Sequence, residues 1–188
     1  MTEEETEIVK LTSVTLTREK QDKIDVEFER YVSATNFVIK TILRDHIPSG
    51  KKVLEKVKEE FVTRFDKREQ YLRDVVKTAW SEIQRHRRMA KTVRSMRAKA
   101  PVFRDGRMIF SKPIIKIQEQ VLTLETAERE RVPIPYDKPS RNRAAVQLRA
   151  LAGGSREYER VRLTWNKEGY MNIDIRIKGE PSVGHVTP

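Results

Sequence analysis

The spacing of hydrophobic and polar residues divides the chain into a short leading strand, a helical middle and a strand-rich last part. Residues Ile8–Leu16 are rich in Val, Thr and Ile, which favour an extended strand. From Arg18 onward, apolar residues recur at helical spacing until Pro48-Ser49-Gly50, a helix stop followed by a turn. This stretch predicts one long amphipathic helix. A second, shorter helix is expected through Val53, Leu54, Val57 and Phe61.

A third helix is predicted to start at Asp66, whose side chain would cap it while Glu69, three residues later, completes a capping-box-like pair. Its apolar stripe continues into a basic segment, so we expect the helix to run on until Pro101. Trp80 in this helix and Trp165 in a later strand are expected to be core anchors, and the alternative for Trp165 is a base-stacking platform. Together the three helices predict a small antiparallel bundle.

After Pro101 the hydrophobic period changes to two, which is typical of strands. Residues Arg104–Arg107 predict a hairpin turn between Val102-Phe103 and Met108–Phe110. The clearest alternation lies in the last two segments, which predict an antiparallel pair joined by a turn at Asn166–Gly169. We expect the strands at Ile114–Ile117, Val121–Glu125, Arg131–Ile134, Arg160–Trp165 and Met171–Lys178.

Several short antiparallel strands with a covering helix, predicted at Ser140–Ala152 before the stop Gly153-Gly154, indicate a small barrel or curled sheet. Since Ile8–Leu16 has no strand partner among the helices that follow it, we expect it to pair with the later strands. The predicted fold class is α+β, a small discontinuous, OB-like antiparallel β-barrel with a three-helix bundle inserted into it. The predicted divisions are a barrel domain at residues 8–17 and 101–179, a helical domain at 18–100, and tails at 1–7 and 180–188.

The charge of the chain adds a second pattern. It has 39 Lys and Arg against 28 Asp and Glu, a formal net charge of +11 and a pI of about 9.9. The excess gathers in Gln84–Arg104, a run without Asp or Glu. Such cations repel one another unless an anion is near, and strong basicity is typical of nucleic-acid binders. The candidate phosphate-binding residues in this run are Arg85, Arg87, Arg88, Lys91, Arg94, Arg97, Lys99 and Arg104.

When the basic run is placed on helical spacing, its two sides differ in character. Arg87, Lys91 and Arg94 fall on one face. The opposite face is apolar, so we expect it to pack on protein while the basic face meets a polyanion. Its residues are Met89, Val93, Met96 and Ala100. The alternative interpretation is a helix face that is simply solvated and screened by salt.

Four further cations extend the predicted nucleic-acid surface. Arg73 and Lys77 precede the basic run on the same predicted helix and can lengthen a phosphate-tracking stripe. Arg141 and Arg143 lie at the predicted start of the short helix, where backbone amides also favour phosphate.

Several classes of protein are excluded by what the sequence lacks. Without cysteine there are no disulfides and no thiolate zinc sites, and the three histidines form no cluster. No Walker loop, HExxH or dinucleotide-binding pattern is present. No apolar span or signal peptide is found, so the expected location is the cytoplasm, at the nucleoid, with no membrane partner. We therefore expect no catalytic residues, metal or cofactor in this chain.

Several short segments match, in order, the phrases of one protein family. They are Val9-Lys10-Leu11, Tyr31 and Asn36 in the first helix, the long helix through Trp80, Ala100–Arg104, and Gly169–Ile173. The fourth is like the phrase K-x-P-x-F, and the last is like G-x-W/Y-x-L/V. Over Ile8–Lys178 the chain thereby resembles the N-terminal half of the TnpB-type, transposon-associated RNA-guided nucleases, relatives of the type V CRISPR effectors.

In that family the discontinuous barrel is called the wedge domain and the inserted helices the recognition domain. The resemblance implies that the barrel holds guide-RNA backbone and helps to read a short motif flanking the target, while the helices hold the guide–target duplex. Sequence reading is left to base pairing, so the protein needs chiefly basic channels shaped for A-form backbone. The implied partners are structured guide-like RNA and DNA, with a downstream nuclease domain.

The nuclease activity of the family belongs to a RuvC-like domain with three acidic metal-binding residues, which follows the barrel. This chain ends where that domain would begin, so we expect the chain alone to be no enzyme. Asp174 superficially resembles the first of those residues, but Arg176 stands where a glycine would be expected, and we interpret Asp174 as a solvated strand carboxylate. Two alternatives stay open: a stand-alone DNA- or RNA-binding module, and a helical scaffold for an acidic protein partner.

Overall fold

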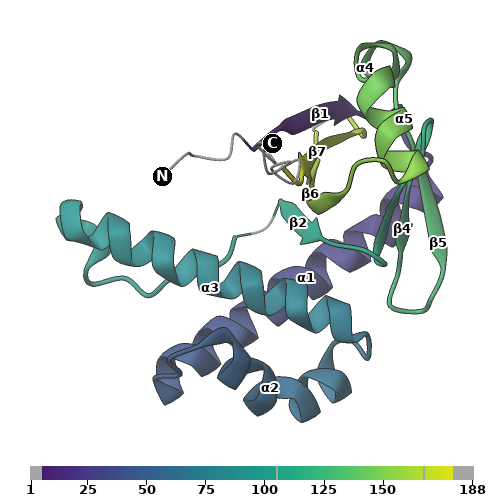
Figure 1. Ribbon diagram of the computed structural model, residues 1–188. Helices are drawn as coiled ribbons and strands as arrows, with labels where there is room; N and C mark the ends of the chain where they lie inside the picture. Colours follow the sequence, from purple (N-terminus) through teal and green to yellow (C-terminus); the bar gives the residue numbers. More distant parts are fainter. Residues whose placement is uncertain (1–5, 105, 167, 180–188) are drawn as a thin grey trace, which may run out of the picture.

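The structure, a computed structural model, describes residues 6–104, 106–166 and 168–179, and its fold class is α+β (Figure 1). The first strand is β1 (Ile8–Thr12). It is followed by the helices α1 (Arg18–Asp45), α2 (Gly50–Arg64), α3 (Glu69–Thr92) and the short 3-10 helix η1 (Arg94–Met96). The later elements are β2 (Arg107–Phe110), β3 (Ile115–Ile117), β4 (Val121–Glu125), β5 (Arg131–Pro135), α4 (Lys138–Arg143), α5 (Ala145–Gly153), β6 (Tyr158–Trp165) and β7 (Met171–Ile177).

Side-chain caps set the ends of the first two helices. α1 begins after Thr17, whose hydroxyl accepts the N–H of Lys20 (3.4 Å). It ends at His46, which has the left-handed φ of 47°. α2 begins after Ser49, whose hydroxyl accepts the N–H of Lys52 (3.4 Å). The first two predicted helices are therefore confirmed.

The three long helices and the sheets share one aromatic cluster. Phe61 of α2 lies 6.0 Å from Tyr71 of α3, and Tyr71 lies 6.2 Å from Tyr31 of α1, measured between ring centroids. Phe103 and Phe110, from the chain after the helices, lie 5.6 and 5.2 Å from Tyr31. All five rings are buried, and such edge and tilted pairs are favourable beyond their buried area. The helices are thus fixed relative to the strands.

α3 differs from its prediction at both ends. Asp66 does not cap the helix: its carboxylate accepts the Arg68 backbone N–H (2.8 Å) and guanidinium (2.7 Å), and the helix begins at Glu69. At the other end, α3 stops at Thr92 instead of running through the whole basic segment. Helical stability comes mostly from packing of an apolar face, and no residue of α3 beyond Ile83 is buried.

β1 pairs with β7 and so joins the two ends of the sequence across the helical part. The four-stranded antiparallel sheet has the order β1-β7-β6-β2. Leu11 of β1 lies opposite Ile173 of β7, which lies opposite Leu163 of β6. These side chains are buried, whereas the alternating Lys10 and Arg162 are exposed. The predicted pairing of the leading strand with later strands is confirmed.

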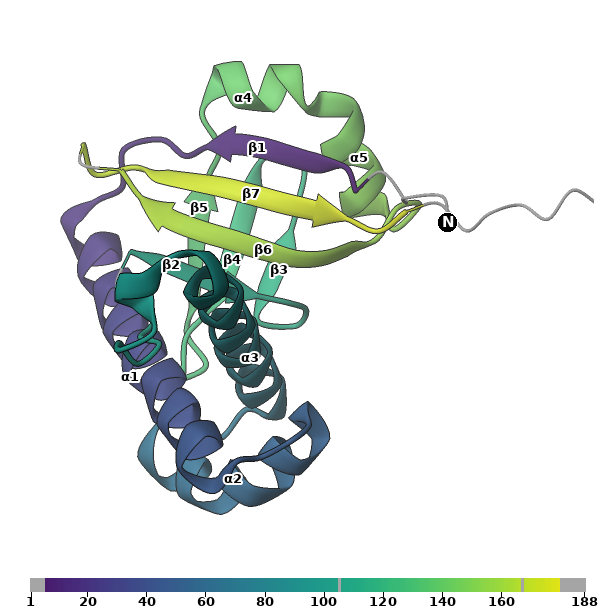
Figure 2. The same ribbon diagram turned by 90° about the vertical axis from the view of Figure 1, so that its left-hand side faces the viewer.

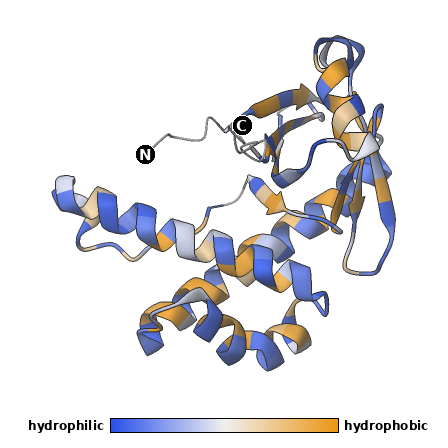
Figure 3. Ribbon diagram, in the orientation of Figure 1, coloured by the Kyte–Doolittle hydropathy of each residue, from blue (hydrophilic) through white to orange (hydrophobic). Residues whose placement is uncertain are grey.

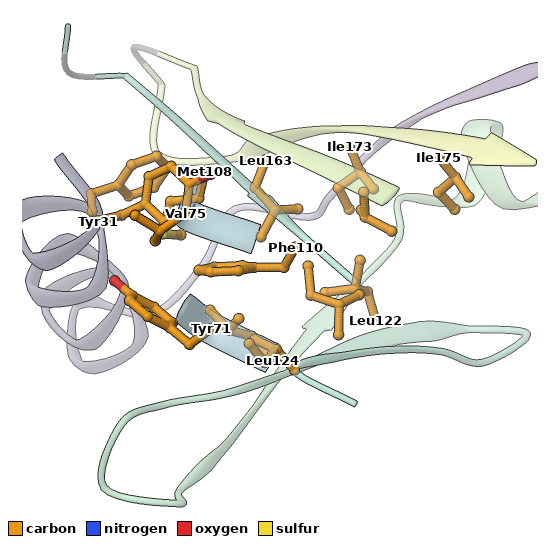
Figure 4. Packing of buried hydrophobic residues seen from close by; sticks show 14 of the residues in the cluster. Tyr31, Tyr71, Val75, Met108, Phe110, Leu122, Leu124, Leu163, Ile173 and Ile175 are labelled. Atoms are coloured by element: carbon orange, nitrogen blue, oxygen red, sulfur yellow. The ribbon is translucent and has the colours of Figure 1, made fainter. Parts of the chain in front are cut away.

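β3, β4 and β5 form a second antiparallel sheet, which faces the first across the hydrophobic core (Figure 2). Figure 4 shows Phe110 of β2 between Leu163 of the first sheet and Leu124 of β4. All three side chains are fully buried. The inward positions of both sheets therefore build one core, as the alternation in the sequence predicts.

The predicted OB-like barrel does not close: in the described part of the chain the strands form two sheets, with an isolated bridge between Ser13 and Tyr136. The two sheets meet at one edge, where the Asp137 N–H donates to the Thr12 carbonyl (2.8 Å). Between β2 and β3, the Ser111 N–H donates to the carboxylate of Asp74 on α3 (2.9 Å). Burial raises the pKa of Asp74, although the bonds from Ser111 oppose the shift. Asp74 of the helical insert thus binds the segment that links the two sheets.

The hairpin predicted around Arg104–Arg107 is also absent, because β2 pairs with β6 rather than with the residues before the turn. Asn36 of α1 holds Phe103 instead. Its side-chain amide donates to the Phe103 carbonyl (3.0 Å), and its oxygen accepts the Phe103 N–H (2.8 Å). Since Asn36 satisfies both backbone groups of Phe103, no strand partner is required there. Asp105, in the expected turn, lies outside the described residues.

The helix predicted at Ser140–Ala152 is observed as two short helices that break at Ala144. Asp137 caps α4, its carboxylate accepting the Ser140 N–H (2.8 Å). α5 ends at Gly154, whose φ of 80° belongs to the left-handed region that glycine adopts without strain. The pair packs against β1 and β3 and covers one end of the core (Figure 2).

A set of charged residues connects the helices to the three-stranded sheet, and we call Glu27, Arg30, Asp66, Arg68 and Glu125 the helix–sheet joint. Glu27, Asp66 and Arg68 are buried, and Arg30 and Glu125 are half-buried. Arg68 donates to Asp66 and to the backbone carbonyl of Glu125, and its guanidinium lies 3.8 Å from the Glu27 carboxylate. Arg30 also donates to Glu27. Burial raises the pKa of Glu27, although Arg30 and Arg68 oppose the shift. Both arginines of the joint therefore have carboxylate partners.

Candidate nucleic-acid interface

The end of α3 projects beyond the other helices before the chain returns to β2 (Figure 1). We call residues 84–102 the basic arm. None of them is buried, whereas Ile83, just before the arm, is 1% exposed. The arm holds seven Lys and Arg residues and no Asp or Glu. Figure 3 shows the projecting helix in mainly hydrophilic colours. The arm therefore carries positive charge into solvent and adds nothing to the buried core.

Most arm cations lack an acidic partner. Five of them form no ion pair with any described carboxylate: Arg87, Arg88, Lys91, Arg94 and Lys99. The other two are engaged. Arg85 donates to Glu82 (3.0 Å). Arg97 folds back and donates to the carbonyls of Ala90 (2.9 Å) and Lys91 (3.1 Å), so it caps the end of α3, a role that residue spacing did not predict.

The returning segment places its cations differently from the prediction. Arg94 lies in η1, off the α-helical face that it was expected to share with Arg87 and Lys91. Lys99 and Arg104 follow it, and both are exposed. Arg104, just past the arm, also has no ion pair with a described residue. The predicted cations of this segment are thus accessible, but they are not aligned on one helix.

A stripe of cations follows the solvent-facing side of α3. Four of them fall within about 60° of one another on helical spacing: Arg73, Lys77, Arg88 and Lys91. From first to last the stripe is about 27 Å long at 1.5 Å per residue. Arg73 is partly neutralised by Glu69 (2.7 Å), whereas Lys77 has no ion pair among the described residues. The stripe thus consists of two pairs of cations, about 16 Å apart along one side of α3.

The apolar face of the basic run does not pack on protein, contrary to the prediction. Met89 and Val93 are 41% and 42% exposed, Ala100 is also exposed, and Met96 is half-buried. Two features explain this. α3 ends at Thr92, so the helical spacing that aligned these residues no longer holds. The arm also extends past α1 and α2, the surfaces on which such a face would pack (Figure 1).

Arg141 and Arg143 lie away from the arm, on α4 at the opposite edge of the four-stranded sheet (Figure 2). Arg143 donates to the Lys10 carbonyl (3.0 Å), and Arg141 is half-buried. At the start of α4, the Asp137 carboxylate already takes one of the backbone amides considered for phosphate. The structure does not bring these two arginines together with the arm cations.

The polar face of the four-stranded sheet lies on the side toward which the arm projects (Figures 1 and 2). Its charges are mixed: Arg162 donates to Asp174 (2.7 Å), and Arg176 lies 3.5 Å from Glu159. Asp174 is therefore an ion-paired carboxylate on this face. Lys10 of β1 is exposed and has no ion pair in the described ranges, and it was not among the predicted phosphate-binding residues.

A recess of about 280 Å³ lies at the base of the arm, between the end of α1 and the middle of α3. Trp80 and Arg87 line it from α3, and His46 and Pro48 line it from the turn after α1. Trp80 is half-buried, so it is only in part the core anchor that we expected. Spacing along one helix could not reveal this site, because its walls come from segments far apart in sequence.

Apart from the exposed positive charge of the arm, the described residues show few features of a chemical site. Across residues 6–104, 106–166 and 168–179, no group of His, Asp and Glu is placed to hold a metal ion. None of the helices in these ranges is long and apolar enough to cross a membrane. The two carboxyls with pKa values raised by burial, Glu27 and Asp74, lie in contacts between helices and sheets. Their shifts therefore belong to the fold rather than to the arm.

A comparison with models of known protein families finds no match, and a comparison with curated protein sequences finds no significant match either.

Proposed function

We propose that the basic arm binds the sugar-phosphate backbone of structured RNA, and of DNA paired with it. The observation that carries the proposal is the set of five arm cations without a described carboxylate partner, on an arm with no buried residue. Holding these charges close together costs self-repulsion, which a polyanion relieves. Lys and Arg on phosphates displace condensed counterions, which makes such binding favourable at low salt.

The geometry of α3 favours a nucleic-acid backbone over a small anion. The stripe on α3 presents two pairs of cations about 16 Å apart on one side of the helix, and a duplex presents phosphates at regular intervals. Most arm cations are arginines, whose planar fork can make two hydrogen bonds to one phosphate. The mixed-charge face of the four-stranded sheet lies on the side to which the arm points (Figure 2). A duplex along the stripe would approach this face as well.

In its wider setting, the chain would serve as the recognition half of a TnpB-type RNA-guided DNA endonuclease, acting in the cytoplasm at the nucleoid. This extension depends on the resemblance over Ile8–Lys178. It is supported by the element order, because the helices stand between β1 and β7, the strand that pairs with it, as a recognition domain inserted into a wedge domain would. Cutting would belong to a separate nuclease domain. A stand-alone DNA- or RNA-binding module would use the same arm.

A second candidate is a scaffold for an acidic protein. The exposed Met89 and Val93 favour it, because the centre of a protein interface is usually apolar. In that case the arm cations would surround an apolar contact. A competition experiment separates the two candidates. A flexible polyanion without bases can replace an acidic protein, but it cannot reproduce a structured RNA.

The deciding experiment reverses three arm charges with Arg87→Glu, Lys91→Glu and Arg94→Glu in one variant. The matched control, Lys51→Glu, Lys52→Glu and Lys58→Glu on α2, changes the net charge equally at three exposed positions. Fluorescence anisotropy measures the Kd for an RNA hairpin at about 0.1 M salt. We expect the arm variant to lose affinity at least about tenfold and its salt slope to fall by about 2 to 3. The control should stay within roughly twofold, since its changes act only through weak, screened long-range charge.

Equal losses in the two variants would contradict the proposal, because only net charge would then matter. Displacement of the RNA by polyglutamate, as effective as by unlabelled RNA of equal charge, would support the acidic-partner candidate instead. Circular dichroism of both variants checks that the helices are intact.

A further inference from the structure

The recess at the base of the arm combines an apolar floor with a cationic rim. Ile42 and Ile47 are 1% and 8% exposed, and they line it beside the half-buried Trp80. Arg87 stands at its rim, is exposed and has no ion pair with a described carboxylate. Its volume of about 280 Å³ is just below that of typical ligand pockets, roughly 300 to 1,000 Å³, and suits one flat group rather than a large ligand.

The tryptophans of the chain differ in how their indole N–H groups are used. Trp165 donates its N–H to Asp25 (2.8 Å) and packs against Phe28, with ring centroids 6.2 Å apart. The N–H of Trp80 has no hydrogen-bond partner among the described residues. Trp80 also lies seven residues before Arg87, so both fall on nearly the same side of α3. An aromatic ring and an unpaired guanidinium therefore open to the same recess.

We propose that this recess takes one unpaired nucleobase from the nucleic acid whose backbone the arm binds, with the base against Trp80 and a neighbouring phosphate on Arg87. The inference rests on the proposed function. Bases stack on aromatic side chains whatever their identity, and an adjacent Arg adds a cation over the base or its phosphate. Because the recess is continuous with the arm, a base that leaves a bulge or loop reaches it while the paired backbone stays on the cations.

The test compares two RNA hairpins that differ only in one unpaired nucleotide. The protein carries Trp165→Phe, so that Trp80 is the single remaining tryptophan and its fluorescence reports the recess. We expect both hairpins to bind, because both offer paired backbone to the arm. Only the hairpin with the unpaired nucleotide should quench the Trp80 emission. The same hairpins made as DNA show whether the recess distinguishes the two sugars.

Substitutions at Trp80 separate stacking from packing. Trp80→Leu keeps an apolar side chain but removes the flat ring, and we expect roughly fivefold or greater loss of affinity for the hairpin with the unpaired nucleotide. Affinity for the fully paired hairpin should be unchanged, and Trp80→Phe should restore much of the loss. If Trp80→Leu does not fold, Arg87→Ala on the surface provides the same comparison, with a larger loss for the hairpin that has the unpaired base.

The outcomes keep the two proposals apart. Equal quenching by both hairpins, or no quenching while both bind, overturns the nucleobase site and leaves the arm as a backbone binder. Equal loss of both affinities in Trp80→Leu overturns it too, because Trp80 would then act only through the fold. If neither hairpin binds, the proposed function itself is wrong, and the nucleobase site with it.

Discussion

Arginine has opposite roles in the helix–sheet joint and in the basic arm. Arg68 of the joint is 6% exposed and is held by Asp66, Glu27 and Glu125. The arm cations are exposed, and most have no carboxylate near them in the described residues. A buried charge must be paired inside the protein, whereas an exposed cluster can be paired by a ligand. The net charge of +11 therefore does not identify the cations that can bind a ligand. The burial and the ion-pair partners of each cation are needed for that.

The largest expected effect comes from Arg68→Met in the joint. The change leaves Asp66 and Glu27 buried near each other with one cation fewer, and it removes a donor to the Glu125 carbonyl. Breaking a buried ion pair by removing one partner typically costs about 3 to 5 kcal/mol. We expect a fall of that size in the free energy of unfolding, measured by urea denaturation followed by circular dichroism.

The matched control for this prediction is Arg18→Met, since Arg18 pairs with Asp22 (3.2 Å) on an exposed part of α1. Exposed pairs contribute about 0 to 1 kcal/mol, so this variant should lose little. If Arg68→Met cost no more than Arg18→Met, the joint would not depend on its buried cation, and the contrast with the arm would lose its basis.

Asn36→Ala is expected to have the next largest effect, because Asn36 holds the chain where the arm returns to the sheets. The substitution leaves the N–H and carbonyl of the buried Phe103 without their side-chain partners. An unsatisfied buried polar group costs about 1 to 3 kcal/mol, and we expect a loss in that range. The control is Asn142→Ala, at an exposed position of α4, with a change within about 0.5 kcal/mol. If Asn36→Ala and Asn142→Ala changed the stability equally in thermal unfolding, water would be shown to replace Asn36 as the hydrogen-bond partner of Phe103.

The parts of the fold that could be predicted are those set by local pattern. The alternation of buried residues placed β6 and β7. The lack of a nearby partner for β1 predicted its pairing with the later strands, and it pairs with β7. The barrel does not close and the hairpin was wrong, because side chains of α1 and α3, Asn36 and Asp74, satisfy backbone groups that strands would otherwise pair. Those contacts join residues far apart in sequence, and no local periodicity records them.

For the candidate site, the sequence located the basic run but did not predict the contacts of each basic residue. The acid-free run pointed to the arm, where five cations are indeed unpaired among the described residues. The contacts of the individual cations could not be predicted. Arg97 of the arm caps a helix that ends early, and Arg143 of α4 donates to a strand carbonyl. The recess at Trp80 was missed because most of its lining comes from the end of α1 and from the turn around His46 and Pro48.

The pH dependence of stability tests which effect dominates within the joint. Burial raises the pKa of Glu27 above its ordinary 4.5, so the folded protein holds this proton more tightly than the unfolded chain. The resulting stability is present below the ordinary pKa and is lost as pH rises through the raised pKa. Glu27→Gln removes this titration, while Asp74 titrates in both proteins. We expect the stability difference, wild type minus variant, to grow as pH falls from about 7 toward 4.5.

Urea unfolding at a series of pH values measures this difference. A difference that shrinks on acidification would mean that Arg30 and Arg68 hold the Glu27 pKa below its ordinary value. Glu27 would then be ionised and paired with the two arginines. The difference between the paired charges of the joint and the unpaired cations of the arm would be larger than the structure indicates. Glu29→Gln, at an exposed position of the same helix, serves as the control without buried charge.

The smallest expected effect on stability is that of neutralising the arm itself. Arg87→Ala, Arg88→Ala and Lys91→Ala remove three cations that touch no described carboxylate and cover no core. Alanine favours helix, and fewer like charges reduce repulsion, so the free energy of unfolding should change by no more than about 0.5 kcal/mol, or rise. The same triple variant should bind an RNA hairpin more weakly. A stability loss approaching that of Arg68→Met would mean that these cations stabilise the fold, and that arm and joint are alike. Unchanged stability together with lost affinity would show that these cations serve the binding of an external polyanion and not the fold.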